Sequence, residues 1–142
     1  MGASVYLHWP NAAREDQEDH PGFDQDDHAY ASWITAVSSN RELVIELEDR
    51  GLDALLKIGE FGQSEKKMKY ATPDEIAIAA MKLKAILPTN DALVQKLTRL
   101  YRSGIGEEPE YIELGYDIAN LASIAKYAEG RGAKQLAILI GW

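Results

Sequence analysis

Apolar positions near the C-terminus form the most regular pattern in the chain. From residue 109 onwards they recur every three or four residues and predict one long helix with two apolar faces. One face contains Tyr111, Leu114, Ile118, Leu121, Ala125 and Ala128. The second face contains Ile112, Tyr116, Ala119, Ile124 and Tyr127. A helix that is apolar on two faces is expected to be buried.

The residues after this helix predict a stop and then a strand. Gly130 and Gly132 can adopt the left-handed backbone that ends helices, and the charge of Arg131 suits the carbonyl end of a helix. The unbroken apolar run at residues 136–140 is typical of a strand covered on both faces. Residues 4–9 alternate in polarity before a proline and predict another strand. We expect the two strands to pair, so that the chain ends meet in one small sheet.

The first half of the chain between these strands predicts helices. Residues 29–37 have apolar positions at helical spacing. Asn40 is suited to cap a second helix, whose apolar pattern continues across Gly51 to residue 58. A strand at residues 43–47 is the alternative, because this stretch contains adjacent β-branched side chains.

Further helices follow a connector predicted at residues 59–69. The run Thr-Pro-Asp-Glu at residues 72–75 is a capping box with proline at the first helical position. The helix that it starts is expected to end at Pro88, and the next helix to begin at residue 90 or 91. The order of strand, helices and strand predicts an α+β fold, mostly helical, with a small sheet formed by the N- and C-terminal strands.

Composition supports one globular domain spanning residues 1–142. The chain is 46% hydrophobic and 27% charged, which is ordinary for a globular protein of this length. It contains no cysteine, which excludes disulfides and thiolate-ligated zinc. The N-terminal residues lack a basic region, and no stretch reaches the roughly 18 apolar residues of a membrane span. We therefore expect a cytoplasmic protein without membrane contact.

Negative charge is concentrated in one segment. Of the net charge of −8, residues 10–28 contribute −6 through seven acids and one base. The rest of the chain carries 16 acids and 14 bases. Within this segment, a Pro-Gly pair predicts a polar loop over residues 11–28, here called the acidic segment. Its charge disfavours direct nucleic-acid binding and favours a protein partner with a basic surface.

Aromatic residues accompany these acids. Charge steering next to aromatic side chains is a common composition of a protein-docking surface. The predicted partner-binding residues are Asp16, Glu18, Asp19, Phe23, Asp24, Asp26, Asp27, Tyr30 and Trp33.

Catalytic and metal-binding motifs are weak in comparison. His20, His28 and the neighbouring aspartates match neither an EF-hand loop nor a histidine pair one helical turn apart, so a solvated loop is the preferred interpretation. His8 has no nucleophile placed by a motif and is interpreted as structural. Lysines 66, 67 and 69 form only a small basic patch. We predict no catalytic residue, no metal, no cofactor and no enzymatic activity.

Three stretches carry a resemblance to a known family. These are the Met-Gly start followed by a strand, residues 70–76 (YATPDEI), and residues 128–133 (AEGRGA) before the last apolar run. They resemble the small bacterial YfbM-like proteins and the immunity-type proteins of polymorphic toxin systems. The acidic segment is not part of that pattern. The resemblance implies a bacterial or phage accessory protein that acts by binding.

The leading hypothesis is a non-enzymatic immunity or inhibitor protein that neutralises a toxin or another basic protein through its acidic surface. One alternative is a phage anti-defence protein that mimics nucleic acid. The other is a small metal-dependent hydrolase that uses His8, His20 or His28. The partner and the oligomeric state are not encoded in any recognisable pattern.

Overall fold

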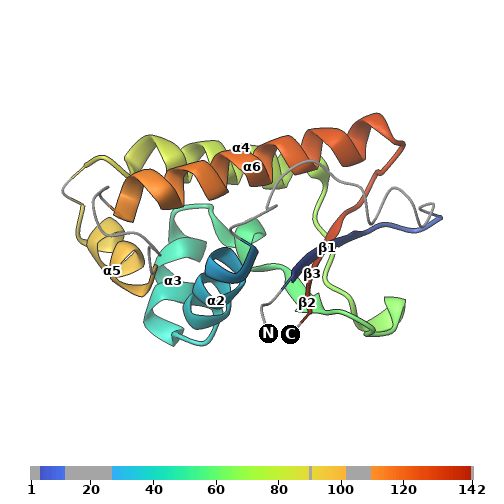
Figure 1. Ribbon diagram of the computed structural model, residues 1–142, viewed down its shortest axis with the longest axis horizontal. Coiled ribbons are helices and arrows are strands. Elements are labelled where there is room, and N and C mark those ends of the chain that lie inside the picture. The colour runs from blue at the N-terminus through green and yellow to red at the C-terminus, as the bar shows by residue number, and fades with distance from the viewer. Residues whose placement is uncertain (1–3, 12–26, 90, 102–109, 142) are drawn as a thin grey trace.

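The two ends of the chain meet in one sheet, as the sequence predicts. The computed structural model describes residues 4–11, 27–89, 91–101 and 110–141. Strand β1 (Ser4–His8) runs antiparallel to β3 (Ala137–Gly141), with Val5 opposite Ile140 and Leu7 opposite Ile138. The fold is α+β and mostly helical (Figure 1), which confirms the expected class.

A third strand completes the sheet and was not predicted. Strand β2 (Ile58–Glu60) pairs in parallel with the other edge of β3, so the strand order is β1-β3-β2. The sequence predicted helix up to residue 58 and a connector after it. A strand of three residues with a central glycine is too short to show alternation, and β3 supplies its partner from a distant part of the chain. A Cβ at Gly59 would lie 2.5 Å from Gln63 Oε1 and 3.2 Å from the Leu139 side chain, so a larger residue would require both side chains to shift.

The helices form two groups (Figure 1). Helices α2 (Asp27–Ser38), α3 (Arg41–Asp49) and α5 (Ala92–Leu100) lie together beside the sheet. The long helices α4 (Pro73–Ile86) and α6 (Glu110–Gly130) lie side by side across them. Two short 3₁₀ turns, η1 (Asp53–Leu56) and η2 (Glu65–Lys67), flank β2 in the sequence.

Local capping signals explain where several helices begin and end. At the start of α4, the Glu75 amide donates to Thr72 Oγ1 (3.1 Å) and the Thr72 amide donates to Glu75 Oε1 (3.3 Å), as the capping box predicts. Asn40 Oδ1 accepts from the Leu43 amide, so residues 43–47 belong to a helix and the strand alternative is wrong. At the end of α6, Gly132 has a φ of 94° and the Ala133 amide donates to the Ala128 carbonyl (3.0 Å).

Helix α6 is buried on one face and partly exposed on the other. Leu114, Ile118 and Leu121 of the first predicted face are buried, but Tyr116 of the second face is 60% exposed. Ile124 is buried because it lies about 80° around the helix from Tyr116, on the side of the first face. The prediction of two buried faces is therefore wrong for Tyr116. The helix packs on the core from outside and leaves one side in solvent.

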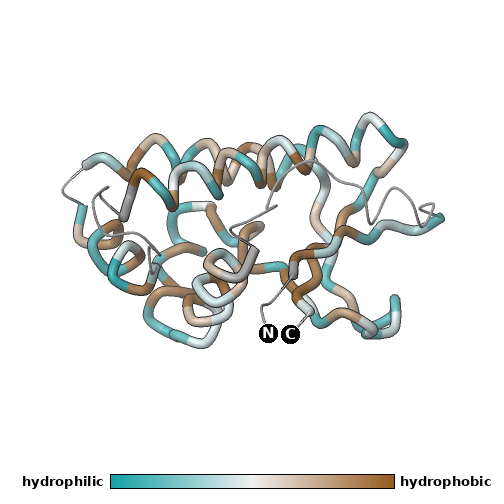
Figure 2. Tube along the Cα trace, viewed as in Figure 1, coloured by the Kyte–Doolittle hydropathy of each residue, from teal (hydrophilic) through white to brown (hydrophobic). Residues whose placement is uncertain are grey.

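The hydrophobic core is continuous from the sheet to the helices. Hydrophobic positions (brown in Figure 2) are concentrated in β3 and alternate with hydrophilic ones along the helices. Leu7, Leu97 and Ile138, from three distant parts of the chain, belong to this one cluster. None of the described helices is both long and apolar enough to cross a membrane.

Replacing Thr72 tests the capping box. Thr72→Ala removes the side-chain acceptor of the Glu75 amide, so we expect the free energy of unfolding to fall by about 1 kcal/mol in urea titration. Ser123→Ala, on the exposed side of α6, should change it by less than about 0.5 kcal/mol. If the two substitutions changed the free energy of unfolding equally, the capping box would not be stabilising.

Candidate functional site

The acidic segment is described by the structure only at its two flanks. The predicted partner-binding residues that lie outside the described residues are Asp16, Glu18, Asp19, Phe23, Asp24 and Asp26. Asp27 is the first residue of α2, but its side chain is also outside the described set. One flank is residues 9–11, directly after β1, and the other is the first half of α2.

The flank on α2 does not present an exposed aromatic surface. Tyr30 and Trp33 are 1% and 2% exposed, so their predicted role as partner anchors is wrong. The Trp33 Nε1–H donates to the Leu97 carbonyl (2.9 Å), and the rings of Tyr30 and Trp33 are 5.8 Å apart. Residues 30, 33, 34 and 37 form the inward face of α2. Their helical spacing puts these residues on one face of α2, and in the structure that face packs on the core.

The flank on β1 is fixed in a similar way. Trp9 is buried, and the backbone of Asn11 has a φ of 66°, a left-handed conformation that asparagine tolerates better than most residues. In the sequence, the acidic segment therefore lies between two buried aromatic residues, Trp9 and Tyr30. Both attachment points belong to the hydrophobic core.

An open pocket of about 690 Å³ lies beside the first flank. Its walls come from the end of β1, the start of α4 and the turn after α6; the lining residues are Trp9, Pro10, Asn11, Thr72, Arg131, Gly132, Lys134 and Gln135. The charged residues among them are Arg131 and Lys134, and the Arg131 guanidinium lies 5.0 Å from the centre of the Tyr127 ring. A wall with this charge favours anionic groups, so this pocket is not a docking surface for a basic partner.

The core contains a carboxylate that the sequence analysis did not identify. Asp117 of α6 is fully buried, and the Tyr101 hydroxyl donates to its Oδ2 at 2.6 Å. This length is typical of a hydrogen bond to an ionised acceptor. Burial, and then the negative charge of Asp117, raise the pKa of the Tyr30 phenol. The burial of Asp117 could have been predicted from the sequence, because Asp117 lies three residues after Leu114 and four before Leu121, within the apolar stripe.

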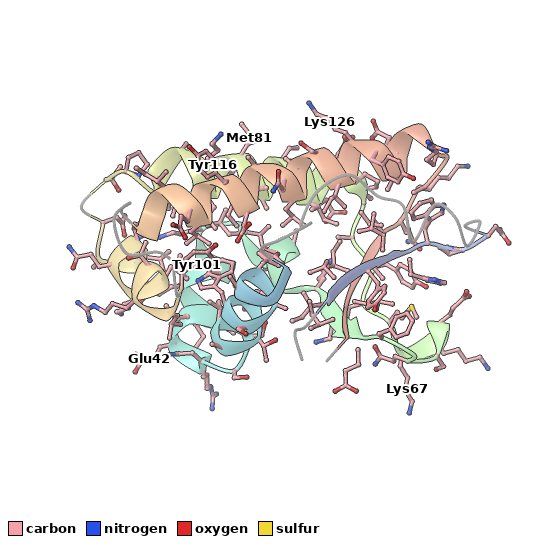
Figure 3. All side chains as sticks on the ribbon, in the orientation of Figure 1. Glu42, Lys67, Met81, Tyr101, Tyr116 and Lys126 are labelled. Carbon is pink, nitrogen blue, oxygen red and sulfur yellow. The ribbon has the colours of Figure 1, made fainter. Side chains whose placement is uncertain are left out.

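This group is suited to holding helices together rather than to catalysis. Asp117, Tyr101 and Tyr30 come from α6, the end of α5 and α2, which pack against one another at this point (Figure 3 labels Tyr101 in the interior). Two phenols beside one buried carboxylate provide no nucleophile and no histidine base. A buried carboxylate needs hydrogen-bond donors, and the Tyr101 hydroxyl supplies one to Oδ2.

His8, the described histidine among the weak catalytic candidates, does not belong to a metal site within the described residues. His8 Nε2 lies 3.0 Å from Glu65 Oε1, which links β1 to η2. Across residues 4–11, 27–89, 91–101 and 110–141, no group of three or more potential metal-ligating side chains is present. His20 and the side chain of His28 lie outside the described set, so the hydrolase alternative stays a prediction.

Removing the Tyr101 hydroxyl tests the importance of the buried hydrogen bond. Tyr101→Phe leaves Asp117 buried with one donor fewer, so we expect a loss of about 1 to 3 kcal/mol in the free energy of unfolding. Tyr116→Phe, at an exposed position, is the matched control and should have little effect. A loss no larger than that of the control would show that the hydrogen bond contributes little.

The pKa of Tyr30 leads to a prediction for alkaline pH. Because its pKa is raised in the folded protein, the unfolded chain loses this proton first, as pH rises above the ordinary value of 10.0. Stability is then lost with a slope of about 1.4 kcal/mol per pH unit from this group. Urea titrations at several alkaline pH values should show a steeper loss for the wild type than for Tyr30→Phe. Parallel losses would contradict the raised pKa.

Comparison with known proteins found no relative of this chain. No protein-family model matches the sequence, and no curated protein or solved structure matches it significantly. The resemblance to YfbM-like and immunity-type proteins therefore stays a prediction from the residues alone.

Proposed function

We propose that this chain is a non-enzymatic binding protein of the inhibitor or immunity type, which neutralises a basic protein partner through its acidic segment. The observation that carries the proposal is the segregation of charge: residues 10–28 hold −6 of the net −8. A charge density of this kind attracts a basic surface and raises the rate of encounter.

The anchoring of the acidic segment supports this proposal. Buried aromatic residues, Trp9 on one side and Tyr30 on the other, attach the segment to the core at both ends. The seven acids lie between these two residues in the sequence, so their charges are concentrated in one short stretch of the chain. Their combined field reaches beyond direct contact by about 8 Å at physiological ionic strength.

The burial of Tyr30 and Trp33 changes which interactions are expected to drive partner binding. These residues have almost no exposed area to offer a partner. Of the aromatic residues predicted for the interface, only Phe23 lies within the acidic segment itself. Binding is therefore expected to depend mainly on charge and to weaken steeply with salt.

The test compares two variants of equal net charge. In the first, Asp16, Glu18, Asp24 and Asp26 are each replaced by lysine. In the second, the control, lysine replaces four exposed acids of α3, η1 and α6: Glu48, Asp49, Asp53 and Glu129. Each tagged protein is used for affinity capture from host lysate at low and high salt. We expect a stoichiometric basic protein to be retained by the wild type and the control, lost from the first variant, and released by salt.

The captured protein then allows the inhibitory step to be measured. Its own activity, in purified form, should fall on addition of the wild type and recover with the first variant. Capture that survives reversal of the segment's charge would contradict the proposal. Release of the partner by added DNA or RNA, in competition with the chain, would instead favour the nucleic-acid mimic.

A further inference from the structure

Exposed apolar side chains gather on the paired long helices. Among the described residues, five large apolar side chains are mostly exposed, and three of these belong to α4 and α6. They are Ile78 (56% exposed), Met81 (54%) and Tyr116 (60%). Another, Phe61, already stacks on Tyr6 with ring centres 4.1 Å apart. Two apolar side chains one turn apart on α4 have no such cover within the described structure.

Ile78 and Met81 belong to a second stripe on α4, opposite the core. The buried stripe of this helix contains Ile76, Ala79, Ala80 and Leu83. The outward stripe, here called the α4 face, contains Asp74, Ile78, Met81, Lys82 and Ala85, all exposed. Figure 3 shows Met81 on the outer side of the helix pair, away from α2, α3 and α5. On α6, Gly115 lies next to the Leu87 side chain, which directly follows α4.

Charge along α4 is balanced and changes sign from one end to the other. Asp74 and Glu75 lie in the first turn, and Lys82 and Lys84 lie in the second half of the helix. The net charge of α4 is therefore zero in a chain of −8. This helix offers the chain a surface on which two copies could meet without strong mutual repulsion. A highly charged partner of either sign would find no complementary surface there.

We propose that the α4 face is the contact surface of a homodimer. A twofold axis passing between Ile78 and Met81 sets the α4 helices of two copies antiparallel. The acids at the start of one α4 then lie beside the lysines in the second half of the other, and this pairing occurs twice. Ile78 and Met81 of both copies meet at the centre, with Lys82 of each copy at the edge of this apolar contact.

The size of the surface fits a small dimer interface. A 14-residue helix is about 21 Å long, and two adjacent helices are about 20 Å wide. Such a face, about 400 Å² in projection, is smaller than the roughly 800 Å² per partner of a standard interface, so we expect a weak dimer. The described flanks of the acidic segment, after β1 and on α2, do not belong to the α4 face.

Sedimentation equilibrium of the full-length chain tests the dimer directly. We expect the wild type to show twice the mass of one chain as its concentration rises from about 1 μM towards 1 mM. Met81→Glu should raise the dissociation constant by at least about 100-fold, because the axis brings two new carboxylates into one apolar centre. Ile45→Glu is the matched control: Ile45 is 49% exposed on α3, outside the α4 face, and its replacement should leave the dimer unchanged.

A charge exchange tests the antiparallel arrangement. Lys82→Glu with Lys84→Glu makes both ends of the face acidic, and Asp74→Lys with Glu75→Lys makes both ends basic. Each variant alone should be monomeric, whereas an equimolar mixture should form the dimer again. Circular dichroism checks that the second variant, which loses part of the capping box, is folded; Asp74→Lys alone replaces it if it is not.

Three results would overturn this proposal. The first is a wild type that remains monomeric throughout the concentration range. The second is a dimer that tolerates Met81→Glu or is lost in Ile45→Glu. The third is a mixture of the charge variants that stays monomeric although both are folded. The dimer does not depend on the proposed partner, since reversal of the acidic segment leaves the α4 face unaltered.

Discussion

The fold depends on the burial of β3 between two strands that come from distant parts of the chain. β1 pairs with it from the N-terminus and β2 from the middle, and the side chains of residues 137–140 are buried. A strand with both edges hydrogen-bonded and both faces covered removes much apolar surface from water. It also determines where α6, which ends shortly before it, and β1, which leads into the acidic segment, are placed.

Within this core, one polar group connects helices that are separated in sequence. The buried carboxylate of Asp117 accepts from Tyr101, and burial together with the charge of Asp117 raises the pKa of Tyr30, so residues of α2, α6 and the end of α5 interact at one place. A buried charge tolerates displacement of its donors poorly, because an unsatisfied carboxylate in a low dielectric is costly. Apolar packing alone is less directional. These interactions therefore help to fix the position of α2 relative to α5 and α6. Helix α2 in turn forms one flank of the acidic segment.

The surface of the protein has regions of different character. The acidic segment concentrates negative charge between two buried attachment points, whereas the pocket beside its first flank is lined by Arg131 and Lys134. The α4 face is neutral overall and apolar at its centre. Charge steering towards a basic partner and self-association through an apolar face are thus assigned to different elements. Under these two proposals, a dimer would present two acidic segments to its partners.

Local patterns in the sequence determined much of the secondary structure, because capping and periodicity act over a few residues. The Thr72 and Glu75 box, the Asn40 cap and the apolar run of β3 were all readable from the sequence. The charge of the acidic segment was equally a property of the sequence. Tertiary packing alone decided that residues 58–60 become a strand, since only β3 supplies their hydrogen-bond partners. It also decided that Tyr30 and Trp33 face the core while Tyr116 faces solvent, because the exposure of an apolar side chain depends on which neighbours cover it.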